Sequence, residues 1–212
     1  YNSGKRWMPI GTTSYQYDYD YFTGSFDGNG FTIKNLYVDS SMGTAGLFGY
    51  NKGIIKNLLI DNCTITAYSS GGSNTSASAY AGGIVAQNTG TIINCGVIGT
   101  ISAGASAIET YASVGGIAGY NNGTIANCYS SIKLFGSTST SYYEYGGSRG
   151  YTHVGGIVGV NNKTIINCHS AGDISASAKK YNNQVYTYAY AGGIVGDNIG
   201  TITNCYTTCI ST

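Results

Sequence analysis

Residues 191–205 read AGGIVGDNIGTITNC, and close copies of this stretch recur along the chain of 212 residues. Copies begin at Ala81, Val114 and Val154, and a looser one begins at Ala45. A repeat of about 20–50 residues is typical of solenoids, propellers and other repeat arrays. The shared turn asparagines set a spacing within that range, and they are Asn51, Asn88, Asn121, Asn161 and Asn198.

Each copy of the repeat reads as short strands separated by turns. GGIVG, TIxNC and a segment such as GDIS (172–175) supply strand residues, and Asn and Gly punctuate them. The sequence shows no sustained apolar spacing of the helical kind. Three short strands fit one coil of a parallel β-helix, whereas a propeller blade would need a fourth. We therefore expect an all-β, single-domain β-solenoid of about six coils of three short strands, with loop inserts on one edge.

Parallel stacking would align equivalent positions of successive coils ~4.8 Å apart. An inward apolar column would contain Leu47, Ile84, Ile117, Ile157 and Ile194. Asn tolerates the left-handed conformation of a bend, which predicts an amide ladder of Asn94, Asn127, Asn167 and Asn204. The next residue of each copy predicts a ladder of buried thiols, Cys95, Cys128, Cys168 and Cys205. Disulfides remain possible for Cys63 and Cys209, which lie outside that column.

The unit GGIVGxNxGTIxNC resembles the GLUG repeat of bacterial surface proteins, and the resemblance covers residues 45–212 apart from the inserts. RWMPIG (6–11) and FTGSFDGNGFTIKNLYV (22–38) look like the segment that leads into such repeats. The resemblance implies a right-handed parallel β-helix, found in adhesins and in non-catalytic regions of some secreted peptidases. It carries over no catalytic residue. We expect one domain over residues 1–212, with a lead-in coil at 1–44 and five repeats at 45–212.

Charged residues make up only 9% of the chain, against ~25% in an ordinary domain, and the net charge is +1. This balance argues against a nucleic-acid partner, which requires clustered Lys and Arg. No apolar run approaches the ~20 residues of a membrane span, so we expect no membrane insertion in this region. The first residue is Tyr1, which suggests the mature part or an excerpt of a longer surface protein. We expect an extracellular or cell-surface location.

Four variable inserts separate the repeats, at 67–80, 103–113, 137–153 and 176–190. We expect them to leave the solenoid as loops along one edge, which repeat proteins often use for binding. Tyrosines recur there and in YQYDYDY, where they could form an aromatic platform for sugars or proteins, or pack down over the solenoid. The candidate binding or assembly residues are Tyr15, Tyr17, Tyr19, Tyr21, Tyr142, Tyr143, Tyr145, Tyr151, Tyr186, Tyr188 and Tyr190.

Catalytic and metal motifs are weak in this sequence. His153 and His169 lack an accompanying nucleophile motif, and no CxxC pair is present. Asp18 and Asp20 alternate on one strand, while Asp27 lies in DGNG, a pattern typical of a tight turn. We expect no enzymatic activity, no cofactor and no metal site.

The sequence thus predicts a non-enzymatic binding module or adhesin whose loop edge contacts a glycan or a protein surface. A first alternative is a filament subunit, in which uncapped coil ends stack head-to-tail on other copies of the chain. A second alternative is the accessory, non-catalytic region of a secreted peptidase.

Overall fold

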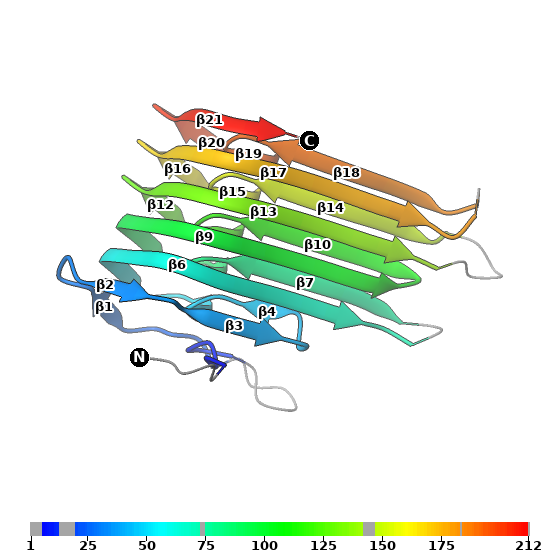
Figure 1. The fold of residues 1–212 in the computed structure, drawn as a ribbon, viewed down its shortest axis with the longest axis horizontal. Coiled ribbons are helices and arrows are strands. Elements are labelled where there is room, and N and C mark those ends of the chain that lie inside the picture. The colour runs from blue at the N-terminus through cyan, green and yellow to red at the C-terminus, as the bar shows by residue number, and fades with distance from the viewer. Residues whose placement is uncertain (1–5, 13–19, 73–74, 142–146, 183, 212) are drawn as a thin grey trace.

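The computed structural model describes residues 6–12, 20–72, 75–141, 147–182 and 184–211. These residues form an all-β solenoid without a helix, in which every strand pairing is parallel (Figure 1). No described helix is therefore long and apolar enough to cross a membrane.

Three sheets make up the solenoid. The long sheet contains β1 (Ser25–Asp27), β2 (Thr32–Lys34), β3 (Tyr37–Ser40), β6 (Ile54–Ser70), β9 (Thr91–Ala107), β12 (Thr124–Ala126), β13 (Tyr129–Thr140), β16 (Thr164–Ile166), β17 (His169–Lys180), β20 (Thr201–Thr203) and β21 (Tyr206–Ser211). The return sheet contains β4 (Thr44–Ala45), β7 (Ser76–Gly82), β10 (Glu109–Gly115), β14 (Arg149–Gly155) and β18 (Tyr186–Gly192). The short sheet contains β5 (Phe48–Asn51), β8 (Val85–Asn88), β11 (Ala118–Asn121), β15 (Val158–Asn161) and β19 (Val195–Asn198).

The chain winds through these sheets in about four turns, fewer than the six coils expected from the sequence. One coil runs along β10, β11, β12 and β13, so it uses four strands, of which the last is long. The lead-in segment accounts for part of the difference in coil number. It pairs with β6 through the short strands β1, β2 and β3 rather than forming a complete coil of its own.

The inserts are mostly strand, which corrects the expectation of loops. β6 continues to Ser70 and β9 to Ala107, and the return strands begin soon after them. Ser137 faces Gly104 on one side and Ser177 on the other, so the register set in the repeat continues through residues that share no sequence pattern. A backbone ladder needs only N–H and C=O groups, and small polar side chains do not interrupt it. The strand ends that join the long and return sheets do gather along one edge (Figure 1).

Two parts of each coil differ in their interior. We call the part around the short sheet the body, residues 46–63, 83–99, 116–132, 156–172 and 193–211. We call the two-layered part formed by the ends of the long strands and the return sheet the wing, residues 64–82, 100–115, 133–155 and 173–192, within the described ranges. Large aliphatic side chains fill the body, and Ile84, Ile117 and Ile157 are fully buried in the expected column. In the wing, large buried residues such as Ile101 and Leu134 lie next to the body, and smaller ones such as Ala105 and Thr138 fill the interior toward the tip.

Asparagines form both corners of the body. The expected ladder stands on the surface: Asn127 has a φ of 53° and donates from Nδ2 to Asn94 Oδ1 at 3.2 Å. A second ladder, which the sequence marked only as turn positions, is buried. In it Asn88 Nδ2 donates to Asn121 Oδ1, and Asn121 Nδ2 donates to Asn161 Oδ1, each at 2.8 Å. These amides satisfy one another and the turn backbone, so a polar corner can be buried at every coil.

Candidate binding surface

Tyrosine rings form two columns on the outer face of the return sheet. Tyr111, Tyr151 and Tyr188 are register partners in β10, β14 and β18, and the rings of Tyr151 and Tyr188 stack at 5.3 Å. Two residues along the same strands, His153 and Tyr190 stack at 5.2 Å with an interplanar angle of 3°. In-register parallel strands place identical positions at the strand spacing, which suits offset stacking of flat rings.

The last return strand presents its rings to solvent. Tyr186, Tyr188 and Tyr190 are 61%, 42% and 44% exposed, and they alternate with Thr187 and Ala189. Alternation along a strand therefore places these three tyrosines on one side of β18. Tyr151 is half-buried beneath its neighbours in the same face.

His153 lies within these columns and is itself buried. Its Nε2 is 3.8 Å from Asp197 Oδ2, and its Nδ1 has no hydrogen-bond partner among the described residues. Burial lowers the pKa of His153, and the Asp197 carboxylate offsets part of that effect. Burial likewise raises the pKa of Tyr111. Both rings are therefore uncharged at neutral pH, and the columns act as aromatic surface.

A second group of tyrosines surrounds a hollow of about 520 Å³ beside the columns, between the return and short sheets. Tyr50, Gln87 and Tyr120 are register partners in β5, β8 and β11. Tyr80 packs against Tyr120 with ring centroids 6.2 Å apart, and Tyr21 packs against Tyr50 at 5.8 Å. Tyr21 is the one residue of this group that was predicted from the sequence as a binding candidate. The register of the GYN, AQN and GYN turns could have identified the column.

The tyrosines predicted as binding candidates fall into three groups. Tyr151, Tyr186, Tyr188 and Tyr190 come together on the return sheet, whereas Tyr21 lies at the hollow. The remainder lie outside the described residues, namely Tyr15, Tyr17, Tyr19, Tyr142, Tyr143 and Tyr145.

Residues 110–134 match the family model for the GLUG motif. The matched segment begins at the second residue of β10 and ends within β13, so one motif covers the body of one coil and its return strand. Motif and fold together fit a GLUG-repeat β-helix.

Two known proteins are similar to this chain. It is 34% identical to halomucin from Haloquadratum walsbyi over 104 residues, which are 48% of this chain and 1% of halomucin. The chain thus spans a very small part of that relative. The crystal structure of a candidate immunoglobulin A1 protease from Bacteroides ovatus superposes with a TM-score of 0.57 over 99% of this chain and 67% of that one. At 20% identity, this second likeness concerns the fold.

The six cysteines are free thiols in the structure, including Cys63 and Cys209. The predicted thiol column is present, since the Cys128 N–H donates to Cys168 Sγ and the Cys168 N–H to Cys205 Sγ, each at 3.4 Å. Burial raises the pKa of Cys63 to about 12, and hydrogen bonds within the column, first that with Cys168, raise the pKa of Cys128. A reactive or metal-binding cysteine acts as the thiolate, so these two thiols are poor candidates for chemistry.

The carboxylates of the described residues also have structural partners or lie apart. Asp27 Oδ1 accepts hydrogen bonds from Asn57 Nδ2 at 3.0 Å and from the Asn29 N–H at 2.9 Å, and Lys56 lies 3.2 Å from Oδ2. These contacts, led by Asn57, lower its pKa and fit the predicted turn. No three His, Cys, Asp or Glu residues group together in the described ranges in a way that could hold a metal ion. Asp18 lies outside those ranges.

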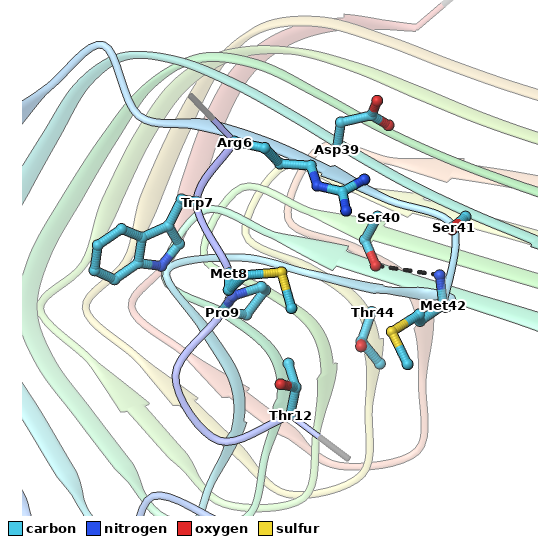
Figure 2. A pocket seen from close by; sticks show the side chains of 10 residues that line it. All are labelled: Arg6, Trp7, Met8, Pro9, Thr12, Asp39, Ser40, Ser41, Met42 and Thr44. Carbon is cyan, nitrogen blue, oxygen red and sulfur yellow. Dashed lines mark hydrogen bonds between the residues drawn. The ribbon is translucent and has the colours of Figure 1, made fainter. Parts of the chain in front are cut away.

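Another hollow lies beside the lead-in segment and is much smaller. Arg6, Met8, Asp39 and Met42 are among the residues that line it (Figure 2), and its volume is about 60 Å³. Beside it, Trp7 Nε1 donates to the Leu47 carbonyl at 3.1 Å and ties the lead-in to the first coil. This volume holds a few water molecules, so the hollow is a packing feature of the lead-in.

Proposed function

We propose that this chain is a non-enzymatic binding module of the cell surface or the extracellular space, which holds a glycan or protein partner on its tyrosine columns. One observation carries the proposal: register-stacked, half-exposed rings occupy one face of the return sheet.

The rigidity of these rings supports a role in recognition. Tyr188 and Tyr190 each stack on a ring of the adjacent coil, so little side-chain freedom remains to be lost when a partner binds. Binding surfaces gain affinity when their side chains are ordered beforehand. A tyrosine also offers an apolar face and a hydroxyl, which suits both sugar rings and protein surfaces.

The chemistry of the described residues supports binding rather than catalysis. Burial raises the pKa of the Cys63 thiol, and His153 is buried between aromatic rings instead of beside a nucleophile. The similarity to halomucin and the low content of charged residues support an extracellular or surface location.

Self-assembly and a role beside a peptidase domain are alternatives that remain predictions. Sedimentation over a concentration series tests assembly: mass that grows with concentration would favour a filament subunit. The peptidase alternative depends on sequence beyond these residues, because the Bacteroides ovatus structure shares the fold at low identity.

The binding proposal is tested with a glycan array and with surfaces coated with extracellular proteins. Tyr188→Ala removes an exposed ring from the column and should weaken binding at least tenfold. Tyr206→Ala is the matched control, because Tyr206 is 63% exposed and stacks on His169 in the long sheet, away from the return sheet. Equal losses in both variants, or undiminished binding by Tyr188→Ala, would reject the tyrosine columns as the contact surface.

A further inference from the structure

The hollow between the return and short sheets has a gap in its row of rings. Tyr50, Gln87 and Tyr120 occupy the same position in three successive coils, so Gln87 stands where a third ring would continue the row. Gln87 Nε2 donates to the Tyr50 hydroxyl at 3.3 Å. At this position the row therefore has the Gln87 amide, with the Tyr50 ring on one side and the Tyr120 ring on the other.

Further rings enclose this gap. Tyr80 stands edge-on to Tyr120, with an interplanar angle of 79°, and Tyr21 stands edge-on to Tyr50, at 77°. The Tyr120 hydroxyl accepts a hydrogen bond from Asn162 Nδ2, which fixes that ring. The walls are thus held in place by contacts within the protein.

The polar groups at the hollow are uncharged. Its described lining consists of tyrosines, Asn51, Ser78, Gln87 and Thr89. Lys52 does not line the hollow, but its Nζ lies 3.4 Å from the ring centroid of Tyr21, which does. A lining of rings, amides and hydroxyls suits a ligand that combines an apolar ring face with many neutral hydroxyls. The hollow of about 520 Å³ lies within the range of small-molecule sites.

We propose that this hollow is a binding subsite for a neutral pyranose residue of a glycan. The sugar ring fills the place of the missing aromatic ring, packs against Tyr80 and Tyr120, and exchanges hydrogen bonds with the Gln87 amide. The inference rests on the proposed binding function and specifies a site and a ligand class for it.

The test measures binding of neutral probes by isothermal titration calorimetry and saturation-transfer NMR. The probes are methyl β-glucoside, methyl β-galactoside, N-acetylglucosamine and their β-linked disaccharides, with glucuronate as the acidic comparison. We expect saturable binding of at least one neutral probe and weaker binding of glucuronate. Gln87→Tyr should complete the row of rings, fill the gap and weaken binding at least tenfold.

Two further variants test whether binding depends on the hollow itself. Gln184→Tyr adds the same ring at an exposed position of the described chain outside the hollow and should leave binding unchanged. Tyr80→Ala removes a wall and should also weaken binding at least tenfold, with circular dichroism and the melting temperature reporting whether the coil is intact.

The outcomes separate this inference from the proposed function. If glycan binding survives Gln87→Tyr but is lost in Tyr188→Ala, the hollow is not the subsite, although the binding module stands. Saturable binding of no neutral probe, or tighter binding of glucuronate, overturns the subsite as stated. If the wild-type chain binds neither the glycan array nor the protein-coated surfaces, the proposed function itself is rejected.

Discussion

The body and the wing of one coil bury polar groups in different ways. In the body, asparagine amides form a ladder along the solenoid axis, and each amide bonds to the equivalent residue of the next coil. In the wing, threonine hydroxyls pair across the two sheets, as between Thr110 and Thr140 at 2.6 Å and between Thr138 and Thr152 at 2.9 Å. The body therefore couples coil to coil, whereas these pairs couple sheet to sheet.

The size of the apolar side chains follows the same division. Along β13 the buried positions change from Ile132 and Leu134 in the direction of the body to Gly136 and Thr138 toward the tip. A Cβ on Gly136 would collide with Val154 and Thr152 of the return sheet. The sheets approach each other closely in the wing because its side chains are small, so the wing has less apolar surface to bury than the body.

Breaking the body ladder should give the largest loss of stability. Asn121→Ala removes the acceptor of Asn88 Nδ2 and the donor to Asn161 Oδ1, and it leaves the Gly123 N–H without its side-chain acceptor. Buried groups left without a partner cost about 1–3 kcal/mol each, so we expect the free energy of unfolding to fall by about 2–4 kcal/mol. Urea denaturation followed by circular dichroism measures this change.

The exposed ladder supplies the control for that substitution. Asn127→Ala removes an amide of the same coil, but its neighbours Asn94 and Asn167 remain in contact with water. The positive φ of this position should cost an alanine about 1 kcal/mol. A loss for Asn121→Ala no greater than that for Asn127→Ala would contradict the structural role of the buried ladder.

Separating the wing pairs should have a smaller effect. Thr140→Val leaves the Thr110 hydroxyl buried without its partner, which should lower the free energy of unfolding by about 1–2 kcal/mol. Replacing both residues with valine should recover most of this loss, because no unpaired hydroxyl remains. A double variant as unstable as Thr140→Val would show that the pair is not an independent unit, and a double-mutant cycle in urea measures the coupling.

The same division explains what the sequence could predict. Ile117, Asn127 and Cys128 repeat at fixed places, and their columns follow from stacking one copy on the next. The inserts of the wing carry no repeated residue pattern, so they were expected to be loops. The strand register set in the repeat continues into them instead. The hollow at Gln87 depends on two sheets meeting, a relation between positions distant in the sequence that the repeat alone does not reveal.

The smallest predicted effect is a dependence of stability on pH that arises in the wing. His153 has a pKa below its ordinary value of 6.5, chiefly because it is buried. A lowered pKa in the folded state means that the contribution of His153 is complete above about pH 6.5 and is lost as the pH falls through the lowered pKa. Melting temperatures should therefore decline on mild acidification, before most carboxylates are protonated.

His153→Phe separates this effect from acid denaturation in general. Phenylalanine keeps a flat ring between Tyr151 and Tyr190 but has no proton to gain. Its melting temperature should stay level between about pH 7 and pH 5, where the wild-type value declines. Parallel declines in both proteins would assign the pH dependence to other groups. If the melting temperature stays level with pH in the variant alone, stacking in the wing depends on a neutral imidazole. The amide ladder of the body, by contrast, has no group that titrates in this range.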